Sequence, residues 1–310
     1  MGGLYNKMVG FLFAGQGSQY VGMGKDLYET FPESKAVFDR ADKVLGFSLT
    51  QHCFEGPQEL LKTTNVSQPA IVTVSLAAFE AFKARSALKP KFAAGLSLGE
   101  YTALIASGAL LFEDGLRLVS KRGRIMDEAA RKHPGKMAAV LELPFEKLKD
   151  ICSRSGAEIA NLNAPGQVVI SGSIDAINKS KELCLEAGAK RFIELEVSGA
   201  FHSSLMFEAS VELKNVLDNT SMHPPAISVV SNYTALPQYK VVQISENLVK
   251  QMRSSVRWED SMRYMLSQGV TDFFEFGPGK VLKGLMRKID ANARVTSVEK
   301  KDDVDKSVSV

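Results

Sequence analysis

Cysteine and long apolar runs are scarce in this sequence, and each scarcity excludes a class of protein. The three cysteines among 310 residues, Cys53, Cys152 and Cys184, lie far apart and form no CxxC pair. Their spacing fits a reducing compartment and offers no metal-site pattern. No apolar run approaches the roughly 20 residues that span a bilayer, and the opening MGGLYNKM lacks the apolar region of a secretory signal. We therefore expect a cytoplasmic protein with no metal and no membrane segment.

Strong charge of either sign is also missing. The formal net charge of +3 is too small to indicate nucleic-acid binding. With 45% hydrophobic and 24% charged residues, the chain is neither a disordered segment nor a small disulfide-rich scaffold. Its 310 residues are enough for one large domain with an insertion, or for two modest domains.

Short apolar stretches alternate with helical periodicity through most of the chain. Residues 9–13 and 92–94 read as buried strands, each followed by a glycine-containing turn. The alternation predicts a mainly parallel sheet covered on both faces. We expect helices near 68–88, 98–107, 113–132, 203–218, 243–252 and 257–268, further strands at 227–231, 271–276 and 293–298, and a frayed tail at 300–310.

The rhythm changes at the HPGK segment, residues 133–136. The order from there to about residue 197 is strand, helix, strand, strand, helix, strand, the split βαββαβ unit of a ferredoxin-like subdomain. We therefore expect a core domain made of 1–133 and 200–310, with a ferredoxin-like subdomain at 134–199 inserted into it.

Gly95-Leu96-Ser97-Leu98-Gly99 satisfies the GxSxG pattern, with a predicted strand before it and a helix after it. Glycines flank the serine where a tight strand-to-helix turn leaves no room for side chains. The helix N-terminus then presents N–H groups to charge developing beside the serine. By itself this pattern fits a nucleophile and an incidental turn alike.

A nucleophilic serine needs a base, and the chain has only four histidines. His52, His133 and His223 have turn-like or polar surroundings without a catalytic cue. His202 lies in the sequence GAFHSSLM, at the junction between the two predicted domains, where clefts commonly form. His202 is therefore the candidate base, with a plain helix N-terminal histidine as the alternative.

Five segments occur in one order along the chain: FAGQGSQ, GLSLGEY, KRGRIM, GAFHSSLM and FEFGPGKVL. In these segments the sequence resembles bacterial-type malonyl-CoA:acyl carrier protein transacylases of fatty acid synthesis, from about residue 8 to 298. The resemblance implies an α/β fold, with an α/β-hydrolase-like core and an inserted ferredoxin-like subdomain. It also implies a stand-alone acyltransferase that passes malonyl from malonyl-CoA to the thiol of acyl carrier protein, with no cofactor. We expect a monomer.

The same resemblance implies a role for particular residues. Ser97 would be the nucleophile, His202 its base, and Gln251 the residue whose main-chain carbonyl orients the histidine, unless Gln251 is simply a surface helix residue. The backbone N–H groups of Gln16 and Leu98 would form the oxyanion hole.

The resemblance also assigns two residues to substrate binding. Arg122 would bind the free carboxylate of malonyl, because a guanidinium can hold a carboxylate through two bonds. Phe201 would exclude an α-methyl group, or would be a core residue. Two basic clusters, at 83–91 and 280–288, are candidate contacts for an acidic carrier protein or for CoA phosphates.

The sequence departs from the family pattern at Leu96, where the family usually has histidine. This puts a local polar contact at the turn in doubt and leaves the base role of His202 intact. Three alternatives remain open from the residues: a polyketide-type acyltransferase, a serine hydrolase such as a thioesterase or esterase, and a catalytically silent module that binds carrier protein.

Overall fold

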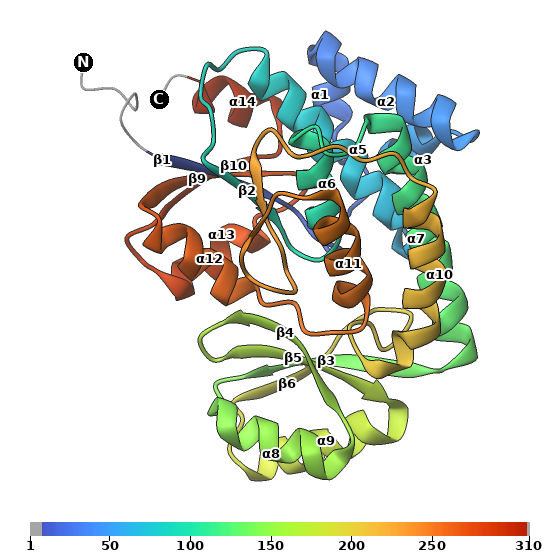
Figure 1. Cartoon of the computed structure of the whole chain (residues 1–310), viewed down its shortest axis with the longest axis vertical. Helices are drawn as coiled ribbons and strands as arrows, with labels where there is room; N and C mark the ends of the chain where they lie inside the picture. The colour runs from blue at the N-terminus through green and yellow to red at the C-terminus, as the bar shows by residue number, and fades with distance from the viewer. Residues whose placement is uncertain (1–7, 309–310) are drawn as a thin grey trace.

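The computed structural model describes residues 8–308, which form two sheets with helices around them (Figure 1). The prediction that no secretory signal begins the chain depends on residues 1–7 and so lies outside the described residues. Within residues 8–308, no helix combines the length and apolar character needed to span a bilayer.

The main sheet has six strands in the order β10-β9-β1-β2-β7-β8, and all neighbours are parallel except β7 and β8. The predicted mainly parallel sheet is confirmed. Its strands are β1 (Met8–Phe13), β2 (Phe92–Gly95), β7 (Ser228–Val230), β8 (Pro237–Gln238), β9 (Val270–Phe276) and β10 (Arg294–Val298).

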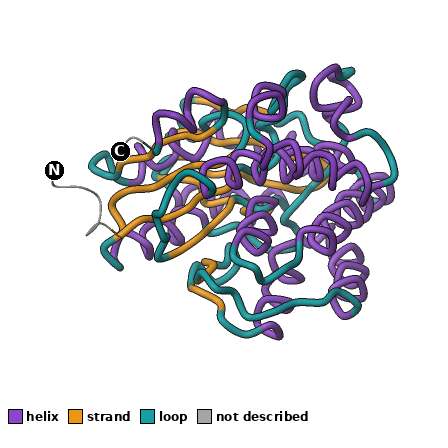
Figure 2. Tube along the Cα trace, turned by 90° about the horizontal axis from the view of Figure 1, so that it is seen from above, coloured by secondary structure: helices purple, strands orange, loops and turns teal. Residues whose placement is uncertain are grey.

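Helices cover both faces of this sheet, and Figure 2 shows them on either side of the strands. The helices are α1 (Lys25–Thr30), α2 (Pro32–Leu45), α3 (Leu49–Glu55), α4 (Gln58–Lys62), α5 (Thr64–Lys83), α6 (Leu98–Ala106), α7 (Phe112–Lys132), α10 (Phe207–Asp218), α11 (Val241–Met252), α12 (Trp258–Ser267), α13 (Val281–Ile289) and α14 (Lys301–Ser307). On the α5 face, the ring of Phe11 lies 5.9 Å from that of Phe79 and 5.1 Å from that of Phe276. These edge-on aromatic contacts join β1, β9 and α5 into one core.

Residues from β3 to β6 form the second sheet, with strand order β4-β5-β3-β6 and antiparallel pairing throughout. The elements follow one another as β3 (Gly135–Leu141), α8 (Phe145–Ser155), β4 (Glu158–Ala164), β5 (Gln167–Ser173), α9 (Ile174–Glu186) and β6 (Arg191–Glu194). The predicted βαββαβ order is confirmed. In Figure 1, α8 and α9 cover the face of this sheet that points away from the core.

Three predicted elements differ from the structure. The tail is helical over Lys301–Ser307, not frayed, because Val304 is buried and Lys301 pairs with Asp305 at 2.7 Å. The helix expected from residue 203 begins at Phe207, after a short 3-10 turn at Ser204–Met206. The helix expected at 68–88 spans Thr64–Lys83, since nearly every side of it is buried and its apolar pattern marks neither end.

The two sheets meet where β4 lies beside the segment before α12. The amide of Val256 donates to the carbonyl of Ala160 at 2.8 Å, and the amide of Leu162 donates to the carbonyl of Val256 at 2.9 Å. The carboxyl ends of β1, β2 and β7 lie at one edge of the main sheet because the three strands are parallel. In open α/β sheets such an edge is where ligands bind.

Candidate active site

Ser97 occupies a sharp turn between β2 and α6. Its φ of 50° and ψ of −96° place it in a backbone region that side-chain-bearing residues seldom adopt. A Cβ on Gly95 would lie 2.0 Å from the carbonyl carbon of Gly99, and one on Gly99 would lie 2.2 Å from the carbonyl oxygen of Phe13. Both flanking glycines are therefore required by close backbone approach. The predicted strand, turn and helix around the serine are present.

The side chain of Ser97 lies within hydrogen-bond distance of His202. Ser97 Oγ is 2.8 Å from His202 Nε2, and His202 Nδ1 is 2.8 Å from the main-chain carbonyl oxygen of Gln251. A carbonyl only accepts hydrogen bonds, so Nδ1 carries the proton and Nε2 is left as the acceptor for the serine hydroxyl. Gln251 is fully buried at the end of α11, which excludes the alternative that it is a surface helix residue.

His202 is held in a buried turn with a positive φ of 58°. Burial lowers its pKa to about 4; the Gln251 carbonyl opposes this, and the charge of Arg122 adds to it. The imidazole is therefore neutral near pH 7 and able to accept a proton. The other three histidines make no contact with Ser97 in residues 8–308; His133, for example, faces Glu208 at 3.8 Å.

Arg122 extends from α7 to the same point, with only 1% of its surface exposed. Its guanidinium donates to Ser97 Oγ at 3.2 Å, to Gln68 Oε1 at 2.8 Å and to Gln251 Oε1 at 3.3 Å. Within the described part of the chain, these partners are uncharged and no carboxylate forms an ion pair with this cation. The guanidinium lies 5.0 Å from the ring centroid of Tyr101, and the buried Glu100 carboxyl interacts with it electrostatically without direct contact. A buried cation with no carboxylate in direct contact suits the site to an anionic ligand.

The two predicted oxyanion-hole residues come from adjacent segments. Gln16 follows β1, and the preceding Gly15 lies against the turn, where a Cβ would come 2.6 Å from the carbonyl oxygen of Leu96. Leu98 is the first residue of α6. Across residues 8–308, the backbone N–H groups of Gln16 and Leu98 donate to no other residue. Both therefore remain available to a ligand.

Phe201 is buried immediately before His202, with 4% of its surface exposed. It belongs to the main apolar core, and its proposed selection against an α-methyl group stays a prediction. Leu96, the departure from the family pattern, packs against the apolar cluster that contains Trp258. An apolar residue at this position thus has an apolar environment.

Sequence reasoning missed three polar residues of the site. Gln68 accepts from Arg122 and also lies 3.4 Å from the amide oxygen of Gln16. Glu100 and Asn232 are buried beside the serine turn. A glutamate in the first turn of a helix is favoured by the helix dipole, so neither Glu100 nor Gln68 nor Asn232 carries a local sequence signal of its role.

Comparison with known proteins agrees with this geometry. Residues 10–299 match the family model described as "Acyl transferase domain". The chain is 44% identical to the malonyl CoA-acyl carrier protein transacylase of Bacillus subtilis (strain 168), over 97% of this chain and 96% of that protein.

Solved structures of similar proteins superpose over nearly the whole chain. One is an MCAT from Streptococcus pneumoniae, 41% identical, with a TM-score of 0.92 and coverage of 97% of this chain and 99% of that one. Another is a malonyl-transacylase in complex with a type II PKS acyl-carrier protein, 34% identical, with a TM-score of 0.95 and coverage of 98% and 99%. The chain therefore belongs to the acyl transferase domain family and, within it, to the malonyl CoA-acyl carrier protein transacylases.

Proposed function

We propose that this protein transfers the malonyl group of malonyl-CoA to the phosphopantetheine thiol of acyl carrier protein, through a malonyl ester on Ser97. The product supplies fatty acid biosynthesis. The observation that carries the proposal is the buried guanidinium of Arg122, which forms no direct ion pair with a carboxylate of residues 8–308 and lies 3.2 Å from the oxygen of Ser97. A carboxylate held there would bring the attached thioester carbonyl to the serine.

In the first half-reaction, Ser97 Oγ attacks the thioester carbonyl while its proton moves to His202 Nε2. The carbonyl oxygen gains negative charge, which the N–H groups of Gln16 and Leu98 stabilise. The carbon–sulfur bond then breaks, and CoA leaves as the thiol with the proton from His202. The carbonyl of Gln251 stabilises the imidazolium that forms between these two proton transfers.

The second half-reaction reverses these steps with a different thiol. The carrier-protein thiol gives its proton to His202 and attacks the malonyl ester, and Ser97 leaves as the hydroxyl with that proton. Every step is a proton transfer or an acyl substitution, so the scheme requires neither a metal nor a redox group.

The basic clusters differ in their suitability for an acidic carrier protein. In the first, Lys83 pairs with Glu80 and Arg85 with Glu33. In the second, on and before α13, no carboxylate of residues 8–308 pairs with a basic side chain, and Lys288 donates to Gln167 of the second sheet at 2.8 Å. We propose the second cluster as the carrier-protein contact.

We also propose residues 1–133 with 200–310 as one domain and 134–199 as the other.

Mass spectrometry after incubation with malonyl-CoA tests the central step. Peptide mapping should place a malonyl adduct on Ser97, and a Ser97→Ala variant should acquire none. The adduct should disappear when phosphopantetheinylated carrier protein is added, with malonyl appearing on its thiol. An adduct on another residue would overturn the mechanism. Release of free malonate at the rate of transfer would favour a hydrolase instead.

The nearest alternative is malonyl transfer to a polyketide carrier protein. It is favoured by the likeness to a malonyl-transacylase bound to a type II PKS acyl-carrier protein. Rates with carrier proteins of both kinds, measured at equal concentration, distinguish the two.

A further inference from the structure

The strained backbone of Ser97 is held by one buried side chain from a distant loop. The amide of Ser97 donates to Asn232 Oδ1 at 2.6 Å, and Asn232 Nδ2 donates to the carbonyl oxygen of Gly95 at 2.9 Å. Asn232 thus bridges the residues on either side of Leu96 in the turn. A positive φ at a residue with a side chain costs on the order of 1–3 kcal/mol and persists only where the surroundings enforce it.

Glu100 connects this asparagine to the residue that orients the histidine. The carboxylate of Glu100 is fully buried. Its Oε2 accepts from the main-chain N–H of Asn232 at 3.0 Å and from the side-chain Nε2 of Gln251 at 2.8 Å. Gln238 Nε2 donates to its other oxygen at 2.8 Å. Gln251 Nε2 also donates to the carbonyl oxygen of Ser97 at 3.0 Å.

These contacts close a ring of hydrogen bonds. It runs from Ser97 through Asn232, Glu100 and Gln251 to His202, and from His202 Nε2 back to Ser97 Oγ. The nucleophile and the α11 carbonyl that orients its base are thereby fixed relative to each other. Buried polar networks of this kind are rigid when every member is satisfied.

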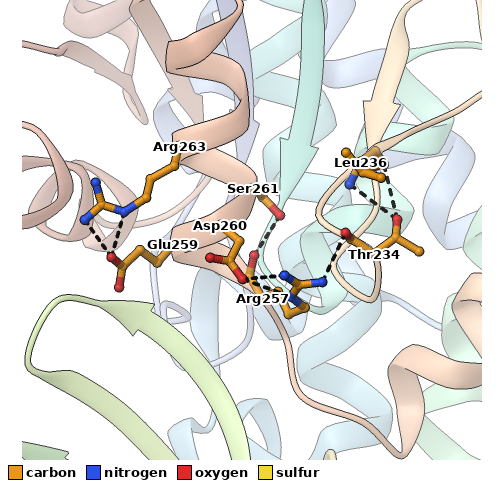
Figure 3. Close-up of polar contacts among 7 residues, drawn as sticks. All are labelled: Thr234, Leu236, Arg257, Glu259, Asp260, Ser261 and Arg263. Carbon is orange, nitrogen blue, oxygen red and sulfur yellow. Dashed lines mark hydrogen bonds and ion pairs between the residues drawn. The ribbon is translucent and has the colours of Figure 1, made fainter. Parts of the chain in front are cut away.

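The β7–β8 loop, which contains Asn232, is held in place by a residue outside the site. The amide of Arg257 donates to the carbonyl oxygen of Asn232 at 2.8 Å. Figure 3 shows the guanidinium of Arg257 between Thr234 of the loop, at 3.3 Å, and Asp260 of α12. The β7–β8 loop therefore holds Asn232 in a defined position.

We infer that Asn232 and Glu100 are positioning residues of the acyl transfer: they hold the Ser97 oxygen and His202 in reacting geometry without touching the substrate. The inference rests on the proposed function only for the identity of the acyl donor. The inference also implies that the main-chain N–H of Ser97 is occupied by its hydrogen bond to Asn232 and does not stabilise the oxyanion.

The test compares Asn232→Ala with a matched control, Asn247→Ala. Asn247 is buried outside this ring of hydrogen bonds and donates to Gln238 Oε1 at 2.9 Å, and its side chain contacts neither the serine turn nor Gln251. We expect Asn232→Ala to lower the acylation rate per folded molecule about 10- to 100-fold, with KM for malonyl-CoA changed less than about twofold, because displacing a reacting group by about 1 Å costs a factor of this size. Asn247→Ala should keep its rate within about twofold.

A fluorophosphonate probe separates this inference from the proposed function. It reacts with an activated serine: an oxygen–phosphorus bond forms, the phosphorus–fluorine bond breaks with release of fluoride, and the serine proton passes to His202. The reaction needs no malonyl group. Labelling of Ser97 should slow in Asn232→Ala in parallel with acylation. Labelling of the wild-type protein without a malonyl adduct would refute the proposed function and leave the positioning role testable.

Glu100→Gln is the second variant should Asn232→Ala not fold. The glutamine keeps the shape of the glutamate side chain. One of its two terminal atoms is an amide nitrogen, however, and this nitrogen faces a hydrogen-bond donor from which it cannot accept. Its labelling rate should fall, and its ratio of malonyl to acetyl transfer should change, because Gln251 also contacts Arg122. If both variants only lower the melting temperature while keeping the labelling rate per folded molecule, or if Asn247→Ala slows labelling equally, the inference is wrong.

Discussion

Lowering the pH from 7 toward 4 should reduce stability first, from about pH 6.5, and activity only near pH 4, because both depend on neutral His202. Burial, reinforced by the charge of Arg122, lowers the pKa of this histidine to about 4, while an unfolded chain has a histidine pKa near 6.5. Between these values the unfolded state takes up a proton that the folded state does not. Stability is therefore lost as the pH falls from about 6.5 to about 4, and this contribution does not change further below that window.

The size of this loss of stability follows from the difference between the two pKa values of His202. One pKa unit corresponds to about 1.4 kcal/mol, so His202 removes about 3 kcal/mol from the free energy of unfolding across the window. His202→Asn lacks this titration. Urea unfolding of both proteins at pH 7, 6, 5 and 4 should show the wild type losing about 3 kcal/mol more than the variant. All other titrating groups are common to both proteins and cancel in the difference.

The pH dependence of Ser97 labelling by a fluorophosphonate reports the pKa of His202, with no contribution from ionisation of the malonyl substrate. Labelling should stay high down to about pH 5 and fall with a midpoint near 4. Arg122→Gln should move the midpoint upward, because removing the neighbouring cation raises the pKa of His202. A midpoint near 6.5 in the wild type, or parallel loss of stability in wild type and His202→Asn, would falsify this reasoning.

Three further predictions concern specificity and the serine turn. Arg122→Ala should lower malonyl transfer at least about 100-fold and acetyl transfer far less, because a buried charge pair is lost only with malonyl; equal losses in steady-state assays would contradict this. Gly99→Ala should lower the free energy of unfolding by about 1–3 kcal/mol in urea titrations, since its Cβ meets the carbonyl oxygen of Phe13; Gly284→Ala, with no heavy atom near its Cβ, is the control. Phe201→Ala should raise methylmalonyl relative to malonyl transfer, and an unchanged ratio would make Phe201 a core residue only.

The fold was predictable where the local pattern is strong. The buried run of β1 and the strand, turn and helix around Ser97 follow from apolar runs and paired glycines. The two ends of α5 could not be predicted in this way, because the helix is buried on almost every side and its apolar pattern marks neither end. The two-residue strand β8 is too short to have a pattern. The helix α14 depends on Val304 reaching the core, and its charged sequence alone does not indicate this.

The sequence by itself indicated a serine in a glycine turn and a histidine at a predicted domain junction, and its resemblance to a known family pointed to one arginine on a helix. Only the tertiary structure decided that Ser97 and His202, 105 positions apart, lie 2.8 Å from each other. It alone brought Asn232 and Glu100 into the same network. The physical reason is that local patterns specify a strand or helix and its buried face, whereas the packing of parallel strands and their crossovers decides which buried donors meet which acceptors.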